Sequence, residues 1–353
     1  MTVSQRISAF EQLGNFMRQF STVSFDKQKE VLYNDIFFDL VQEEITMSVH
    51  RNSWFTLDNM IFAFKSWSDS LTRSNLVHWT SSYTFKENQT KTIGLIMAGN
   101  IPLVGFHDLI SVLISGHKAS VKLSSNDQKL LPILAQYLQK IEPEFENYIT
   151  FTEQKLESFE AVIATGSNNT SRYFEYYFGK YPHIIRKNRN SVAILTGNET
   201  DEELNRLGED IFRYFGLGCR NVSKIFIPRN YDLDILFKAL YPYNSLLDYK
   251  KYSNNYDYNK AVYLMSLFKI YDNGFLILKE DKSYSSPIAS LFYEYYDAIE
   301  LLNDKLDIEQ DQIQCIIGNS AIPNSIPFGT SQKPNLWDYA DDVDTIDFLL
   351  KLT

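Results

Sequence analysis

The first ninety residues carry apolar positions at the spacing of amphipathic helices. Such residues recur three and four positions apart in one stretch and more loosely in another, namely at Phe10, Leu13, Phe16 and Met17, and at Val31, Ile36 and Leu40. This spacing places side chains on a single helical face. We therefore predict a helical layer over residues 1–90, whose apolar faces serve packing.

From residue 91 onward, short apolar runs alternate with longer amphipathic stretches. Strands are predicted at residues 92–97, 119–123, 160–164, 183–185 and 191–195. Apolar helices are predicted between them, at residues 103–115 and after a capping box formed by Ser125 and Gln128. Regular alternation of strand and helix at this spacing is typical of βαβ units and a parallel sheet.

A second alternating series follows residue 195. Thr200 and Glu203 form another capping box. Strands are predicted at residues 222–228, 275–279, 288–293 and 313–317, with a helix at 232–240. Residues 245–272 are rich in Asn, Tyr, Lys and Asp and predict a loop-rich insert. We therefore expect an α/β protein with a helical layer (1–90), a dinucleotide-binding domain (91–195), a catalytic domain (196–330) and a tail (331–353) that packs on the core.

Composition and charge narrow the possible partners. The 353 residues have a formal net charge of −10, which argues against general nucleic-acid binding, since that requires a basic face. Only two cysteines are present, too few for a disulfide framework. No apolar run reaches membrane-spanning length, and the N-terminal stretch lacks the apolar core of a signal peptide. We expect a cytoplasmic protein without a membrane span.

Familiar site motifs are absent from the sequence. There is no G-x-G-x-x-G after a strand, no P-loop, no G-x-S-x-G, no H-E-x-x-H and no C-x-x-C. His107 and His117 stand ten residues apart, which is not metal-ligand spacing. We predict no metal site.

Four segments remain that could carry chemistry, two of them at the ends of predicted strands. Asn100 lies in the Gly-Asn-Ile-Pro turn after the first strand, where a side-chain amide could donate to an oxyanion or serve the turn alone. Lys122 lies at the end of the second strand, where it either reaches a ligand or extends to solvent.

The other two segments are turns with glycine. Residues 164–172 contain Thr165, Gly166 and Ser167 between a strand and a helix, a place where free backbone N–H groups suit a phosphate. Cys219 follows two glycines between a helix and a strand; it is a candidate nucleophile, although a single cysteine is more often an inert buried residue. Cys315 lies in an apolar strand and fits that inert role.

Taken in order, these segments resemble the aldehyde dehydrogenase superfamily over residues 91–330. The resemblance implies a Rossmann-like cofactor domain followed by an α/β catalytic domain. It also implies that Cys219 is the nucleophile and that Asn100 donates to the oxyanion. The residues that it implies as cofactor contacts are Lys122, Ser124, Thr165, Gly166 and Ser167. The Pro327-Phe328-Gly329 turn is similar to one in the same superfamily.

Two departures narrow the resemblance to the LuxC-type acyl-CoA reductase family. Residues 183–190 lack the general-base glutamate of hydrolytic members, and Ser283 stands near a second missing glutamate. The segment from residue 326 to the C-terminus also looks like this family. The resemblance implies reduction of a fatty acyl-CoA to an aldehyde, with NADPH or NADH as cofactor. Alternatives are reduction of an acyl phosphate or a carrier-protein thioester, an acyl-transfer protein needing no nicotinamide, or a non-catalytic scaffold of the same fold.

Two further groups of residues can each be interpreted in two ways. The basic residues Arg186, Lys187 and Arg189 could bind phosphates of CoA or of the cofactor, or form a solvated loop. The aromatic residues Phe292, Tyr293, Tyr295 and Tyr296 could line an acyl tunnel or pack in the core. A homo-oligomer or an acyl-supplying partner protein is compatible with the sequence.

Overall fold

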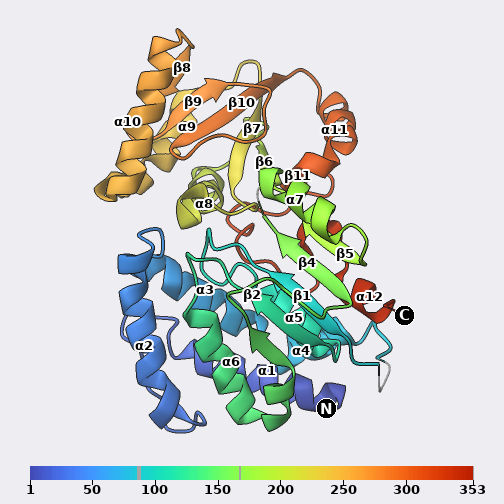
Figure 1. Cartoon of the computed structure of the whole chain (residues 1–353). Coiled ribbons are helices and arrows are strands. Elements are labelled where there is room, and N and C mark those ends of the chain that lie inside the picture. The colour runs from blue at the N-terminus through green and yellow to red at the C-terminus, as the bar shows by residue number, and fades with distance from the viewer. Residues whose placement is uncertain (86–88, 167, 353) are drawn as a thin grey trace. The chain divides into compact units, whose positions relative to one another are not determined.

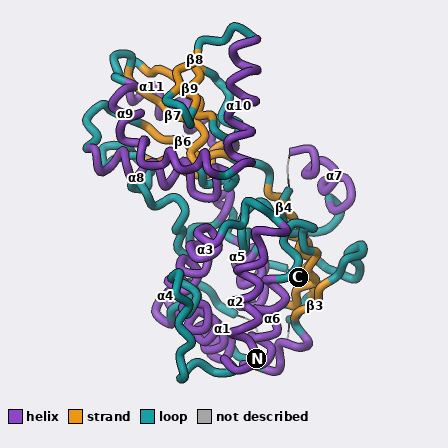
Figure 2. Tube along the Cα trace, turned by 90° about the vertical axis from the view of Figure 1, so that its left-hand side faces the viewer, coloured by secondary structure: helices purple, strands orange, loops and turns teal. Residues whose placement is uncertain are grey.

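A computed structural model describes residues 1–85, 89–166 and 168–352. The chain divides into two compact units. The first unit comprises Met1–Lys187 and Asn335–Thr353, and the second comprises Asn188–Pro334. Each unit consists of a sheet with helices around it (Figures 1 and 2).

The first unit contains a five-stranded parallel sheet of order β3-β2-β1-β4-β5. Its strands are β1 (Thr92–Ile96), β2 (Lys118–Lys122), β3 (Ile149–Phe151), β4 (Ala161–Thr165) and β5 (His183–Arg186). The chain runs outward from β1 to β3 and then returns to place β4 on the other side of β1. Such a switch point leaves a crevice beyond the carboxyl ends of the strands, where ligands bind in open α/β sheets.

Helices of the first unit bury the apolar faces that the sequence predicts. They are α1 (Val3–Arg18), α2 (Asn34–Arg51), α3 (Leu57–Ser70), α4 (Arg73–Thr80), α5 (Phe106–Ile114), α6 (Leu130–Ile141), α7 (Asn168–Phe178) and α12 (Thr345–Leu350). The predicted face of α1 is confirmed, since Phe10, Leu13, Phe16 and Met17 are at most 1% exposed. The predicted face of α2 is wrong: Ile36 and Leu40 are each 45% exposed, and the core is reached by neighbouring residues.

The second unit contains a six-stranded sheet of order β11-β6-β7-β10-β9-β8. Its strands are β6 (Asn190–Ile194), β7 (Val222–Pro228), β8 (Ile270–Asp272), β9 (Ile277–Glu280), β10 (Ser290–Tyr296) and β11 (Ile313–Ile317), and only the edge strand β8 is antiparallel to its neighbour. Its helices are α8 (Asp201–Phe212), α9 (Leu233–Leu240), α10 (Lys250–Met265) and α11 (Ile299–Ile308).

The boundary between the units differs from the predicted one. The structure places it after Lys187, not after residue 195. Strand β6 follows β5 closely along the chain, yet it pairs with β7 and β11 in the second sheet. Residues 192–194 of β6 are fully buried, so the apolar run predicts this strand correctly. The strands that pair with β6, however, lie far from it along the chain. The tail likewise joins the first unit only from Asn335 onward.

Two local predictions are corrected as well. Residues 250–265 form helix α10 instead of a loop, because Tyr252, Tyr256, Asn259 and Tyr263 recur at helical spacing and are buried. The capping box of Ser125 and Gln128 does not form, since α6 begins at Leu130 without a side-chain cap. By contrast, the predicted box of Thr200 and Glu203 is confirmed at the start of α8.

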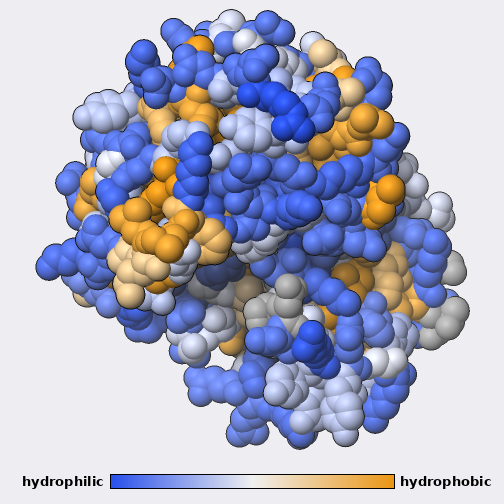
Figure 3. Space-filling model, turned by 90° about the horizontal axis from the view of Figure 1, so that it is seen from above, coloured by the Kyte–Doolittle hydropathy of each residue, from blue (hydrophilic) through white to orange (hydrophobic). Residues whose placement is uncertain are grey.

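One face of the molecule carries polar side chains over most of its area. The face drawn in Figure 3 shows apolar side chains only in separate patches between polar ones. Among residues 1–85, 89–166 and 168–352, no helix combines the length and apolar character needed to cross a bilayer.

Candidate active site

The predicted cofactor residues of the first unit lie at one edge of its sheet. In the parallel register, Ile96 of β1 stands opposite Lys122 of β2 and Ala164 of β4. The carboxyl ends of these three adjacent strands are therefore level. Asn100 follows the first of them, Lys122 ends the second, and Thr165 ends the third. The strand register thus brings these residues to the switch point of the sheet.

Ser124 contacts the glycine next to Asn100. A side chain at Gly99 would place its Cβ 2.7 Å from both Cβ and Oγ of Ser124. The loops after β1 and β2 therefore approach each other as closely as only glycine allows. Within its own loop, the Ser124 hydroxyl accepts a hydrogen bond from the Asn126 N–H at 3.3 Å. Asn100, Lys122 and Ser124 are all half-buried.

Thr165 and Gly166 lead from β4 directly to the first turn of α7, which begins at Asn168. The Gly166 N–H donates to the carbonyl of Arg186 on the neighbouring strand at 3.4 Å. Ser167, the third residue predicted here, lies outside the described residues. The first N–H groups of a helix have no partner within it, so the N-terminus of α7 suits a phosphate.

These features fit a nicotinamide dinucleotide. The switch point provides the crevice, Gly99 permits close approach of two loops, and the start of α7 suits a pyrophosphate. Lys122 and Ser124 lie on one side of the switch point and Thr165 and Gly166 on the other. These four are the described members of the set that the resemblance predicts as cofactor contacts.

In the second unit, Cys219 lies in a turn between α8 and β7. The backbone before it is unusual, because Tyr214, Phe215 and Gly216 all have positive φ (55°, 58° and 77°). Two consecutive non-glycine residues in this region cost of order 1–3 kcal/mol each, and such strain persists only where the surroundings impose it. Cys219 itself is half-buried, and neither cysteine forms a disulfide.

The turn is held in place by Asn221, a buried residue with 2% exposure. Its Oδ1 accepts the Gly218 N–H at 2.8 Å, and its Nδ2 donates to the carbonyls of Arg213 at 2.8 Å and Asp210 at 3.0 Å. One amide side chain thus ties residues 216–219, here called the nucleophile turn after the predicted role of Cys219, to the end of α8. Asn221 is not among the residues predicted from the sequence, where its position two residues after Cys219 is the only signal.

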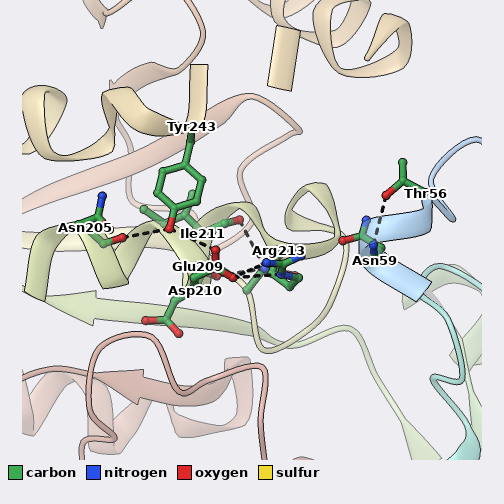
Figure 4. A network of polar contacts seen from close by, with 9 residues as sticks. Thr56, Asn59, Asn205, Glu209, Asp210, Ile211, Arg213 and Tyr243 are labelled. Atoms are coloured by element: carbon green, nitrogen blue, oxygen red, sulfur yellow. Dashed lines mark hydrogen bonds and ion pairs between the residues drawn. The ribbon is translucent and has the colours of Figure 1, made fainter. Parts of the chain in front are cut away.

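A polar network also braces the end of α8 (Figure 4). Arg213 donates to the Glu209 carboxylate from Nε at 3.0 Å and from Nη2 at 2.7 Å. The Tyr243 hydroxyl donates toward Glu209 at 3.3 Å and to the Asn205 carbonyl at 3.1 Å. The Tyr243 ring covers Gly208, where a Cβ would lie 2.1 Å from it.

Asp210 connects α8 to the Pro-Phe-Gly turn. Its fully buried carboxylate accepts the Gly329 N–H at 2.6 Å and the Ser331 N–H at 2.9 Å. Burial raises the pKa of the Asp210 carboxyl, while these two donors lower it. The turn that the sequence analysis singled out by resemblance is therefore anchored directly beside the nucleophile turn.

A cavity of about 220 Å³ opens beside the nucleophile turn within the second unit. Gly216, Leu217 and Gly218 form one wall. Polar groups line part of it and apolar side chains the rest, the polar set being Asn188, Arg189, Asn190, Asn221, Ser223, Ser285, Ser286 and Ser290. None of the described residues that line this cavity is Asp or Glu.

The three basic residues do not form one anion site. Arg186 is 5% exposed and binds Asp108 through two hydrogen bonds, of 2.7 and 3.3 Å. It also donates to the Ala340 carbonyl and the Thr345 hydroxyl at 2.7 and 2.9 Å. Lys187 pairs with Glu175 at the surface. Only Arg189 lines the cavity, so the phosphate interpretation is wrong for Arg186, which secures the C-terminal segment.

The aromatic run of β10 belongs to the core of the second sheet. Phe292 and Tyr293 are 6% and 2% exposed, and the Tyr296 hydroxyl donates to the Leu195 carbonyl at 2.9 Å. None of the four lines the described cavity. Ser283, the residue near the missing glutamate, is exposed and lies just before the lining residues Ser285 and Ser286.

Comparison with known proteins finds similarity in structure alone. No protein-family model and no curated protein sequence matches the chain. Aldehyde dehydrogenase 21 from Physcomitrella patens superposes with a TM-score of 0.63 at 12% identity, covering 90% of this chain and 73% of that one. An oxidoreductase from Marinobacter aquaeolei gives 0.64 at 11%, covering 92% and 74%.

A third solved structure belongs to the same fold group. The indole-3-acetaldehyde dehydrogenase AldA of P. syringae, which was solved with NAD+ and IAA, gives a TM-score of 0.62 at 10% identity and covers 91% of this chain and 73% of that one. These matches extend over nearly the whole chain, across both sheets. The chain therefore has an aldehyde-dehydrogenase-like α/β fold, as the sequence predicts.

Proposed function

We propose that the chain reduces an acyl-CoA thioester to the aldehyde, with NADPH or NADH as reductant and Cys219 as nucleophile. The Cys219 thiolate attacks the thioester carbonyl, and the CoA thiolate leaves and takes up a proton. When bound at the switch point of the first sheet, the reduced nicotinamide supplies a hydride to the acyl carbon. The resulting thiohemiacetal oxyanion collapses to the aldehyde and restores the Cys219 thiolate.

The main support is the segment 183–190, which lacks the general-base glutamate that the resemblance places there. Without that carboxylate, this segment offers no general base to activate water at an acyl-cysteine. The cavity beside the turn, which Cys219 itself does not line, also has no carboxylate among its described lining residues. An acyl-enzyme that must wait for a hydride benefits from that lack. Superposition on aldehyde dehydrogenases supports a thiol-based oxidoreductase, and the missing base favours reduction over oxidation of an aldehyde.

Other residues take roles that rest on the resemblance. Asn100 is assigned as the amide donor to the oxyanion, and Lys122, Ser124, Thr165 and Gly166 as cofactor contacts at the sheet edge. A cytoplasmic location is part of the proposal, because a reducing compartment keeps a thiol nucleophile active.

The test follows NADPH and NADH oxidation by the purified chain over a series of acyl-CoA lengths, with quantification of the aldehyde. One aldehyde and one CoA per reduced cofactor consumed are expected for at least one length. Oxidation of aldehydes with NAD+ to free acid, without CoA dependence, would contradict the proposal and favour an ordinary aldehyde dehydrogenase. Consumption of acyl phosphate but not acyl-CoA would change the substrate class.

A further inference from the structure

The carbonyl group of Cys219 is held by a relay of two side chains, from the buried Ser191 and the half-buried Cys315. The Ser191 hydroxyl, on β6 and fully buried, donates to the Cys219 carbonyl at 3.0 Å. The Sγ of Cys315, on the adjacent strand β11, lies 2.9 Å from the same hydroxyl. Because a hydroxyl that donates to the carbonyl can still accept, the relay runs from the Cys315 thiol to Ser191 and on to Cys219.

The relay requires a protonated Cys315 thiol. Burial raises the pKa of this thiol to about 11, so at neutral pH it retains the proton that it shares with Ser191. Cys315 thus has a definite contact beside the nucleophile turn, in addition to filling space in the strand.

The opposite side of the turn is fixed by Asn221. It accepts the Gly218 N–H and donates to the carbonyls of Asp210 and Arg213. Ser191 fixes the peptide group that follows the Cys219 Cα, through its carbonyl. The peptide group before this Cα is held by the backbone N–H of Asn221, which donates to the Gly218 carbonyl at 3.0 Å. The Asn221 side chain fixes the Gly218 N–H, one peptide group earlier, and so holds both sides of Gly218 together with the backbone. With both peptide planes set, the direction of the Cys219 Cα–Cβ bond is set as well.

We propose that Ser191 and Asn221 are positioning residues that orient the Cys219 thiol for attack, with Cys315 supporting Ser191. The inference rests on the proposed function for the role of Cys219. The strained Tyr214-Phe215-Gly216 backbone explains why two buried side chains are needed. Without them this segment relaxes toward ordinary φ values and carries the cysteine with it.

The experiment compares Ser191→Ala, Asn221→Ala and Asn221→Asp with the wild type. Asp keeps the acceptor for Gly218 but loses the amide donor. The matched control is Asn205→Ala, which deletes a side-chain amide of α8 that donates to the Ala239 carbonyl at 3.3 Å. Cys315→Ser keeps a donor for Ser191, and Cys315→Ala removes it.

Two readouts are taken on folded protein. The first is the rate of Cys219 alkylation by iodoacetamide against pH, located by peptide mass spectrometry, which needs no acyl-CoA. The second is kcat and KM for acyl-CoA. We expect Asn221→Ala and Ser191→Ala to lower kcat about 10- to 100-fold, the effect of a displacement near 1 Å, with KM within about threefold and a changed alkylation profile. Cys315→Ser should restore what Cys315→Ala loses.

The inference is overturned if Ser191→Ala and Asn221→Ala only lower thermal stability, while kcat per folded molecule and the alkylation profile match the wild type. If Asn221→Ala does not fold, Ser191→Ala and the two Cys315 variants carry the same test. An altered alkylation profile without any acyl-CoA turnover in the wild type would refute the proposed function and leave the positioning of the thiol intact.

Discussion

The two units present their functional residues in different ways. In the first unit, Asn100, Lys122 and Thr165 reach one place because each follows or ends a strand of a parallel sheet in level register. In the second unit, Cys219 is held by side chains from β6, from the turn itself and from the neighbouring strand β11. The first site follows from topology, whereas the second depends on long-range hydrogen bonds.

This difference has a consequence for tolerance to change. Residues at the sheet edge keep their place as long as the strands pair, and each acts nearly independently. The nucleophile turn depends on single buried side chains, so one substitution there alters the direction of the thiol. Substitutions in the first unit should therefore change ligand binding, and those in the second should change the rate of the chemical step.

The largest effect is expected for Cys219→Ala. Removal of the thiol should lower reduction of acyl-CoA by at least about 10³-fold, since the proposed acyl-enzyme forms on this thiol. Binding of NADPH or NADH, followed by fluorescence, should stay within about twofold because the cofactor residues lie in the other unit. Cys315→Ser is the matched control and should retain activity. Equal loss in both variants would remove the distinction between the two thiols.

The next largest effect concerns stability of the first unit. Arg186→Met leaves the Asp108 carboxylate buried without its ion-pair partner, which should lower the free energy of unfolding by about 3–5 kcal/mol. Lys187→Met removes an exposed pair with Glu175 and should leave the free energy of unfolding nearly unchanged, because solvent screens such a pair. Denaturant titration measures both. Similar values for the two variants would contradict the assignment of Arg186 to the C-terminal anchor.

Lys122→Met tests the sheet edge. Loss of a charged hydrogen bond to the cofactor should raise the Kd for NADPH or NADH about tenfold. Lys118, the exposed first residue of the same strand, provides the control Lys118→Met, for which no change is expected. An unchanged Kd in Lys122→Met would show that this lysine extends to solvent.

The smallest effect is a dependence of stability on pH that comes from His117. Its Nδ1 accepts the Lys91 N–H, and its Nε2 meets the Leu349 carbonyl, both at 3.1 Å. Burial lowers the pKa of this imidazole from its ordinary 6.5. The unfolded chain therefore takes up a proton at a higher pH than the folded one.

As pH falls below 6.5, the folded state should lose stability, by at most about 1.4 kcal/mol per pH unit from this group. Above that pH the contribution is fully present. Unfolding titrations of the wild type and His117→Gln over this range measure the difference. An identical pH slope in the two proteins would exclude His117 as the source.

Local patterns in the sequence predict strands in both units, but they do not show how all of these strands pair. Local patterns predict the apolar runs of β1, β2 and β4, the ends of these strands and the buried face of α1. The strand register then brings the candidate residues to one edge of the sheet. The partners of β6 could not be predicted, because its apolar residues suit either sheet and its neighbours come from residues 222–228 and 313–317.

The candidate site shows the same limit. The position of Cys219 in a glycine turn makes it a candidate from sequence alone. Ser191, Asp210 and Asn221 could not be recognised as its supports, since each acts on backbone groups that the fold brings to it. Nor could the sequence show that Arg186 forms an ion pair with Asp108, because these residues lie on different elements of the first unit.

The central claim, that Cys219 carries the acyl group until it is reduced, has one direct test. The chain is mixed with acyl-CoA in the absence of reduced cofactor, and its mass is recorded intact and after digestion. The account predicts one acyl group on the Cys219 peptide, which persists in buffer and leaves as aldehyde when NADPH or NADH is added. Absence of an adduct at every chain length, or discharge as free acid, would contradict it.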